Sequence, residues 1–110
     1  MALTDKTGAP VTVVKGEHKF TVAVEQQDVG LATFADRDEQ RVFIHTEVDE
    51  EFGGRGLASV LIGEALARTR AEGMRIVPVC PMVVAFVRKH PENDDVVDRP
   101  TPQILAWLRR

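Results

Sequence analysis

The architecture of this chain follows from one segment, Glu47-Val48-Asp49-Glu50-Glu51-Phe52-Gly53-Gly54-Arg55-Gly56-Leu57-Ala58. It begins at the end of an apolar, β-branched run, passes through acidic residues and three glycines, and opens a long helical pattern. A glycine-rich turn lets the backbone approach a ligand closely, because no Cβ stands in the way. The helix that follows offers free N–H groups and a positive dipole end, which together favour a phosphate or diphosphate. An ordinary strand-to-helix connection without a ligand is the alternative interpretation.

The residues of this segment exclude two well-known phosphate-binding loops. A Walker A loop needs Gly-Lys followed by Ser or Thr, and the sequence contains no such run. A dinucleotide-binding fingerprint needs a third small residue three places after Gly56, where Ser59 is a poor substitute. The repeated βαβ units of a nucleotide-binding sheet are also missing.

Three strand patterns precede the glycine-rich segment. The first, over His18 to Glu25, alternates between apolar and polar residues. The other two are expected over Val29 to Ala35 and over Gln40 to Val48, with a charged turn between them. Because the connections are short, these strands predict an antiparallel meander. Before them, residues 1–16 predict a loose arm that contains a short edge strand over Val11 to Val14.

A long helix is predicted from about Gly54 or Arg55 to Glu72. Apolar residues recur there at helical spacing, and the expected buried face consists of Ala58, Leu61, Ile62, Ala65, Leu66 and Thr69. Gly73 is well placed to end the helix. Met74 to Val79 then predicts a fourth strand beside the third, in a right-handed β-α-β crossover.

Two shorter helices are predicted after the fourth strand. Pro81 suits the first position of one helix, with Cys80 before it, and Pro91 ends that helix. Residues 92–99 are expected to form an acidic, polar linker. Thr101 is expected to cap a last short helix. The apolar residues of that helix should pack on the domain or on a partner: Ile104, Leu105, Trp107 and Leu108.

Length and composition predict a single cytoplasmic domain over residues 1–110, with an α/β fold and a mixed, mostly antiparallel sheet. The formal net charge of −3 argues against a nucleic-acid partner. No apolar run approaches the roughly 20 residues of a membrane span, and residues 1–10 show no secretory segment. The single cysteine, Cys80, cannot form an internal disulfide. The oligomeric state stays open.

Four short runs together resemble a small, short-chain family of the GNAT superfamily of N-acetyltransferases. They are His45-Thr46-Glu47-Val48, Gly54-Arg55-Gly56-Leu57-Ala58, Val77-Pro78-Val79-Cys80-Pro81 and Arg88-Lys89-His90-Pro91-Glu92. The pattern extends from about Lys19 to Val97, so residues 98–110 are a C-terminal extension relative to that family. In the diphosphate loop of the superfamily, Gly56 and Ala58 match. Gly53 stands where Gln or Arg is usual, so one expected side chain is absent.

The resemblance implies a trimmed GNAT core that binds acetyl-CoA and transfers its acetyl group to an amine. It places the diphosphate on the loop amides and the pantetheine arm beside the splayed ends of the third and fourth strands. The Val48 backbone N–H is the implied oxyanion donor. The residues implied in cofactor binding are Val48, Gly53, Gly54, Arg55, Gly56, Leu57, Ala58, Phe86, Arg88 and His90. The acceptor, an amine of a small molecule or a protein, is left open.

Three residues are candidates for the chemistry: His45, Glu47 and Cys80. On a strand, His45 and Glu47 share one face, so they either act as base or substrate anchor or form a solvated face. Cys80 precedes a helix whose dipole favours a thiolate, and the related family carries a cysteine in this setting. It is an acyl-accepting nucleophile, a pocket residue or a small buried hydrophobe. Direct attack by the amine, with Cys80 lining the pocket, is the mechanism we expect.

A metal site and a non-catalytic role are the alternatives to this interpretation. A zinc-deaminase site needs Pro-Cys-x-x-Cys, and no second cysteine is present, so no metal is expected. A CoA sensor or interaction module without turnover is the competing function. Full-sized members of the superfamily carry additional elements around the acceptor site, and this chain is too short for all of them. Turnover with several amines distinguishes the enzyme from the module.

Overall fold

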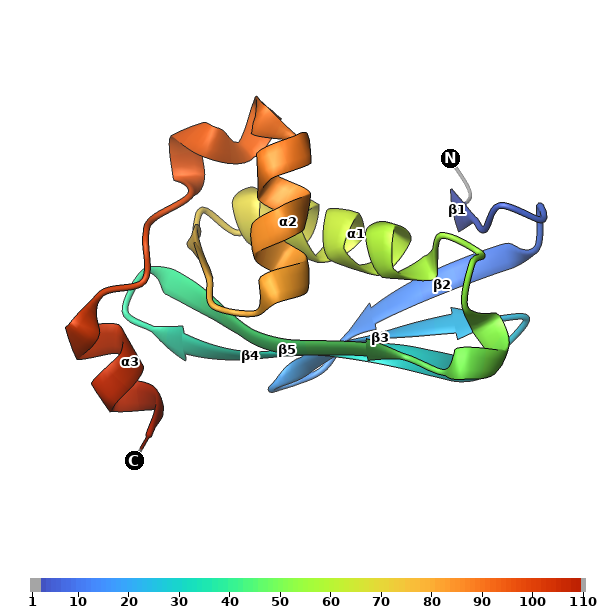
Figure 1. The fold of residues 1–110 in the computed structure, drawn as a ribbon, viewed down its shortest axis with the longest axis horizontal. Coiled ribbons are helices and arrows are strands. Elements are labelled where there is room, and N and C mark those ends of the chain that lie inside the picture. The colour runs from blue at the N-terminus through green and yellow to red at the C-terminus, as the bar shows by residue number, and fades with distance from the viewer. Residues whose placement is uncertain (1–2, 110) are drawn as a thin grey trace.

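A mixed six-stranded sheet forms the base of the molecule in the computed structural model, which describes residues 3–109 (Figure 1). The strands follow chain order across the sheet: β1 (Leu3–Thr4), β2 (Pro10–Lys15), β3 (Lys19–Val24), β4 (Gln27–Arg37), β5 (Gln40–Val48) and β6 (Arg75–Pro78). Neighbours from β1 to β5 are antiparallel, and β6 lies parallel to β5. The predicted meander and the β-α-β crossover are both confirmed.

Helices cover mainly one face of this sheet (Figure 1). They are η1 (Glu50–Phe52), α1 (Leu57–Ala71), α2 (Pro81–Lys89), η2 (Pro91–Val96) and α3 (Pro102–Leu108). Helices α1 and α2 lie on the same side, whereas α3 sits at the end of the sheet and reaches its other side. No helix among residues 3–109 is long and apolar enough to cross a membrane.

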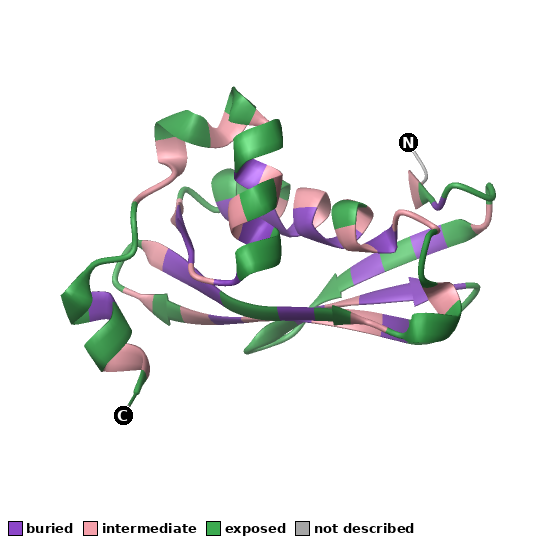
Figure 2. Ribbon diagram, viewed as in Figure 1, coloured by how far each residue is buried: buried purple, intermediate pink, exposed green. Residues whose placement is uncertain are grey.

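The main core lies between the sheet and α1 (Figure 2). Its centre holds Phe20, Phe34 and Phe43, one from each of β3, β4 and β5, with ring centroids 5.2 to 6.3 Å apart. The predicted buried face of the long helix is confirmed at Leu61, Ile62, Ala65, Leu66 and Thr69, while Ala58 is only half-buried. Burial of these apolar side chains is the main force that holds α1 against the sheet.

Residues 3–15 do not form the loose arm that the sequence predicts; residues 1 and 2 of that arm lie outside the described part. Val11 and Val13 alternate with exposed residues in β2 and are buried beneath α1. The Arg68 guanidinium on α1 also donates to the Val13 carbonyl at 2.7 Å. The short edge strand predicted over Val11 to Val14 therefore exists, but it is longer, and β1 rather than β2 forms the edge.

A β-bulge between β4 and β5 changes which side chains face the helices. The register of the pair shifts between Thr33 and Phe34. Before the bulge, Phe43 packs in the core under α1 while Val42 packs against α3. After it, Thr46 is buried beside α2 and Val48 packs on the core, so His45 and Glu47 point to the open face of the sheet.

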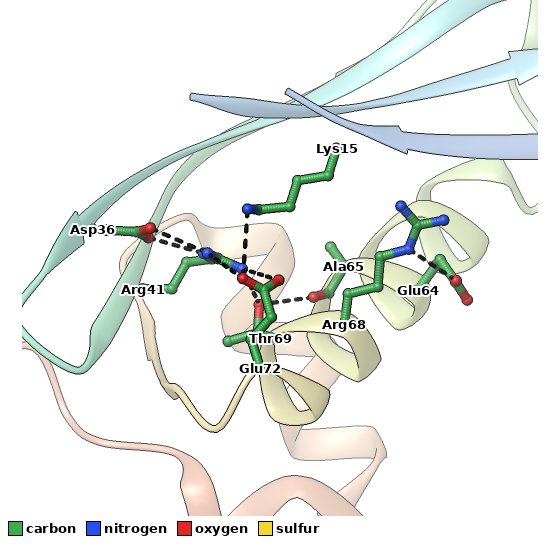
Figure 3. Close-up of polar contacts among 8 residues, drawn as sticks. All are labelled: Lys15, Asp36, Arg41, Glu64, Ala65, Arg68, Thr69 and Glu72. Atoms are coloured by element: carbon green, nitrogen blue, oxygen red, sulfur yellow. Dashed lines mark hydrogen bonds and ion pairs between the residues drawn. The ribbon is translucent and has the colours of Figure 1, made fainter. Parts of the chain in front are cut away.

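A buried arginine ties the hairpin of β4 and β5 to the end of α1 (Figure 3). Arg41 is 1% exposed and bonds Asp36 at 2.8 Å and Glu72 at 3.0 Å, and it lies 4.6 Å from the ring centroid of Phe34. Burial lowers the pKa of Arg41, but the hydrogen bonds to both carboxylates outweigh it and raise the pKa overall. The hydrogen bond from Arg41 also holds the pKa of Glu72 below its ordinary value. Arg41 and Glu72 are therefore both charged at neutral pH.

The acidic segment after α2 is more ordered than the predicted linker. It forms η2, and its carboxylates pair with arginines of the core elements: Asp95 with Arg70 at 2.7 Å and Asp98 with Arg75 at 2.9 Å. Val97 bridges β6 at Ile76. The segment predicted as an acidic, polar linker therefore lies against α1 and β6, in contact through these ion pairs and the bridge of Val97.

The last helix is docked as predicted. The Thr101 hydroxyl oxygen accepts a hydrogen bond from the Ile104 backbone N–H at 3.2 Å, which confirms the N-cap. Ile104 is 1% exposed and packs on Val42 and Val77, on the face of the sheet opposite α1. Trp107 and Leu108 extend this contact, while Leu105 is exposed. Residue 110 of the predicted extension lies outside the described part.

Candidate functional site

The glycine-rich loop leads directly into α1 in a conformation that needs glycine. Gly54 and Gly56 have φ values of +80° and +75°, in the left-handed region that side chains disfavour. Gly56 is the N-cap residue, so α1 begins at Leu57, two residues after the predicted Arg55. Both positions require glycine, because a residue with a side chain is strained at these positive φ values.

The first turn of α1 presents unpaired backbone donors. No side chain caps the helix, and within the described chain no hydrogen bond uses the N–H groups of Leu57, Ala58 or Ser59. The Gly53 N–H, by contrast, donates to the Glu50 carbonyl at 3.0 Å. Free amides and a helix dipole at one point form an anion site, and a glycine without Cβ allows close approach.

The side chain of Arg55 turns away from this site. Its guanidinium forms an ion pair with Asp5 at 2.7 Å and lies 5.0 Å from the Phe52 ring centroid. Only the backbone of Arg55 therefore remains a candidate for contacts with the predicted diphosphate.

A groove of about 210 Å³ runs between α1 and α2, next to the free amides. Its apolar walls come from Ala58, Ile62, Met82 and Phe86, and its rim from Lys89 and His90. The Phe86 ring stacks on His90 with centroids 4.1 Å apart. At Gly63 on α1, an added Cβ would lie only 3.3 Å from Phe86, so this glycine lets the two helices approach.

The groove contains two of the three cofactor-binding residues that the resemblance implies in α2 and at its C-cap. Phe86 and His90 line it, but Arg88 lines a separate hollow together with Val84 and Asp94. The helical period explains the difference, because residues three and four positions after Phe86 share its face and the residue two positions after does not. Lys89, rather than Arg88, lies on the rim of this groove.

The strands β5 and β6 separate close to this groove. β6 ends at Pro78 opposite Phe43, and the N–H groups of Val79 and Cys80 both donate to the Phe43 carbonyl. β5 continues to Val48, so within residues 3–109 no strand lies beside its last part on that side. The Asp49 N–H donates to Val29 on β4, and antiparallel alternation therefore directs the Val48 N–H away from β4, toward this unpaired edge.

Cys80 is the N-cap residue of α2 and lies near the point where β5 and β6 separate. It is 3% exposed, and its thiol donates to the Thr46 hydroxyl at 3.5 Å. The location combines the helix start and the buried setting that the sequence suggested as alternatives. Thr46 was not among the predicted site residues, because only the bulge in β5 brings it to the same face as Cys80.

His45 and Glu47 form a pair on the other face of the sheet. The His45 Nε2 and Glu47 Oε2 atoms are 3.2 Å apart, and the side chains are 60% and 63% exposed. Glu47 also borders a hollow of about 270 Å³ with Asp28, Asp49 and Lys19. The structure thus brings His45 to Glu47 as predicted, but it places both across the sheet from Cys80. Among the described residues, no group of three His, Cys, Asp or Glu side chains is arranged to hold a metal.

Comparison with known proteins identifies a family over most of the chain. Residues 19–96 match the family model described as GCN5-related N-acetyl-transferase. The solution structure of a GCN5-like protein from Staphylococcus aureus superposes with a TM-score of 0.63 at 22% identity, covering 83% of this chain and 91% of that one. The crystal structure of the ribosomal-protein-S18-alanine N-acetyltransferase from Escherichia coli gives a TM-score of 0.51 at 15% identity. That match covers 56% of this chain and 42% of the enzyme. Curated protein sequences gave no match.

Proposed function

This chain belongs to the GCN5-related N-acetyltransferase family, and from that premise we propose that it transfers the acetyl group of acetyl-CoA to an amine. The observation that carries the proposal is the adjacency of two features. Unpaired amides at the start of α1 suit a diphosphate, and the unpaired edge of β5 ends at Val48, where the segment that leads into these amides begins. A diphosphate and an extended pantetheine arm are the parts of CoA that these two features would hold.

The residues present fit this cofactor. Both glycines are in the left-handed region, and the loop backbone is open at Gly54, where an added Cβ would meet no atom within 4 Å. We assign the diphosphate to the amides from Gly54 to Ala58, and the far end of the cofactor to the groove with Phe86, Lys89 and His90. Acetyl-CoA supplies a thioester, whose carbonyl carbon is the electrophile of the reaction.

The protein contributes orientation, charge stabilisation and proton removal. The Val48 N–H at the unpaired edge of β5 is assigned as the donor to the oxygen that becomes negative during attack. The amine nitrogen bonds to the thioester carbon, the C–S bond breaks, and the CoA sulfur leaves as a thiolate that takes up a proton. Glu47, paired with His45, is assigned to accept the proton that the amine loses, directly or through one water.

In this proposal the cofactor and the acceptor bind on opposite faces of the sheet. Cofactor residues lie on the side of α1 and α2, whereas His45 and Glu47 lie on the open side. Beyond Phe43 the edge of β5 has no neighbouring strand on the side of β6 within the described chain, and we assign the meeting point of the two substrates to this edge. The acceptor therefore approaches from the open face and meets the thioester at this edge.

Cys80 is assigned to the pocket wall rather than to an acyl relay. Its side chain is almost fully buried, and its thiol is engaged with Thr46. A nucleophile must reach the thioester carbon, and a buried, hydrogen-bonded thiol is poorly placed to do so. Cys80→Ala should therefore retain most of the transfer rate.

A CoA-binding module without turnover is the second candidate. It is favoured by the open face of the sheet, where α3 at one end is the only helix that packs on it in the described chain. An acceptor bound there has few walls to exclude water or fix its orientation.

Acetyl transfer to a panel of amines separates these alternatives. We expect transfer by the unmodified protein and by Cys80→Ala, and a loss of at least tenfold in Glu47→Gln, typical of removing a general base. Glu17→Gln is the matched control, because Glu17 also pairs with a histidine, His18, at an exposed site away from the loop. CoA binding without transfer to any amine would favour the module. A stable acetyl-cysteine that an amine discharges would establish the relay instead.

A further inference from the structure

The loop between β1 and β2 lies across the glycine-rich loop. The Lys6 backbone N–H donates to the Arg55 carbonyl at 3.0 Å, so the two loops are joined directly. Both Asp5 and Lys6 precede residue 19, where the match to the family model begins. The contact therefore lies outside the part of the chain that the family model matches.

A buried carboxylate fixes this contact. One Asp5 oxygen accepts from the Thr7 N–H at 2.8 Å, the Thr7 hydroxyl at 2.6 Å and the Ala9 N–H at 3.0 Å, while the other pairs with Arg55. The Asp5 side chain has no exposed surface. The hydrogen bond from Thr7 lowers the pKa of Asp5, against the effect of burial, so the carboxylate stays charged at neutral pH. The position of Lys6, next in the chain, follows from this anchor.

The side chain of Lys6 lies against the left-handed glycine at the start of α1. An added Cβ on Gly56 would be 3.1 Å from Lys6 Cε and 3.2 Å from its Cγ. Its ammonium group is one bond beyond Cε and is therefore within reach of the first turn of α1. Lys6 is exposed and takes part in none of the ion pairs found among residues 3–109.

The loop itself supplies no free cation to a phosphate group. Gly53 has no side chain at the position where the superfamily usually has Gln or Arg. The charge of Arg55, the one basic residue of the loop, is balanced by Asp5 at 2.7 Å. Two phosphates held only by amides and a helix dipole would keep most of their negative charge without a counter-charge.

We propose that Lys6 supplies this counter-charge: its ammonium group binds the diphosphate at the start of α1, in place of the side chain missing at Gly53. The proposal rests on the proposed function, because it requires CoA at the loop. Lysine suits the role, since its compact charge on a flexible stem can follow a phosphate oxygen without a fixed geometry. Asp5 and Arg55 act as positioning residues that hold the Lys6 backbone over the loop.

Calorimetric titrations with three ligands test this proposal. The ligands are CoA, dephospho-CoA, which keeps the diphosphate, and pantetheine, which lacks it. Lys6→Gln should weaken CoA and dephospho-CoA by the same factor, about tenfold or more, as expected for one charge-assisted hydrogen bond. Its affinity for pantetheine should be unchanged. Lys6→Arg should keep most of the affinity, and added salt should weaken CoA binding more in the unmodified protein than in Lys6→Gln.

The matched control is Arg109→Gln, which removes the same charge from an exposed residue after α3, at the opposite end of the molecule (Figure 1). It should bind CoA as the unmodified protein does. Equal CoA affinity in Lys6→Gln and the unmodified protein would overturn the role of Lys6 and leave the proposed function standing. An equal loss for pantetheine would also overturn it, because the effect would then not depend on phosphate. Failure of the unmodified protein to bind CoA would instead refute the proposed function, and the role of Lys6 with it.

Discussion

Replacing Gly56 by alanine separates a loss of binding from a loss of stability, because the chain contains a matched glycine. Gly56 and Gly73 flank α1 and both have φ of +75°. An alanine at either position adopts the left-handed region at a cost of about 1 kcal/mol. At Gly73 the new Cβ meets no atom within 4 Å, and at Gly56 it meets only the flexible Lys6 side chain at 3.1 Å. Both variants should therefore be destabilised to a similar degree.

The two variants should differ in CoA binding. At Gly56 the new methyl group displaces the Lys6 side chain from the start of α1 and adds bulk to the loop, so we expect CoA affinity to fall at least tenfold. Gly73 lies at the far end of the helix, and its variant should bind as the unmodified protein does. Thermal unfolding, with a decrease in Tm of about 4 °C for each, measures the stability cost, and calorimetry measures the affinity. Equal CoA affinity in the two variants would refute the assignment of the diphosphate to this loop.

Three further predictions concern the framework of the site. Arg41→Met keeps the packing on Phe34 but removes the hydrogen bonds to Asp36 and Glu72, so the free energy of unfolding in urea should fall by about 2 kcal/mol. A loss below about 1 kcal/mol would contradict the network's role. Because the pKa of Glu72 is lowered in the folded state, its contribution to stability is complete above about pH 4.5 and is lost as the pH falls through the folded value. The free energy of unfolding should therefore decrease on acidification, and less steeply in Arg41→Met than in the unmodified protein. Parallel pH dependences of the two proteins would argue against the pair. Trp107 is half-buried while α3 is docked, and Ile104→Ala should release this helix, so tryptophan emission should shift to the red. Emission typical of a solvated indole in the unmodified protein would exclude docking of α3.

Much of the fold could be predicted because its patterns are local. Strand β5 runs from Gln40 to Val48 as predicted, and α1 ends one residue before Glu72. The cap at Thr101 follows from a short-range preference that the structure confirms. Periodicity and turn residues act within a few positions, so the sequence alone displays them.

What the sequence did not reveal depends on contacts between distant residues. The ordering of residues 3–15 rests partly on the pairing of Asp5 with Arg55, which are far apart in the chain. The bulge opposite Thr33 gives no sign in the apolar run of β5, yet it decides that Thr46 faces Cys80. The exclusion of Arg88 from the groove, by contrast, follows from helical spacing and was within reach of sequence reasoning.

Whether the chain holds CoA at all is decided by a calorimetric titration of the unmodified protein. The free amides of α1 and the unpaired edge of β5 predict a saturable heat with one CoA per chain. Prior addition of acetyl-CoA should abolish that heat, because both ligands share the diphosphate and the pantetheine arm. Absence of any heat with CoA at high micromolar concentration, in protein shown to be folded, would contradict the account.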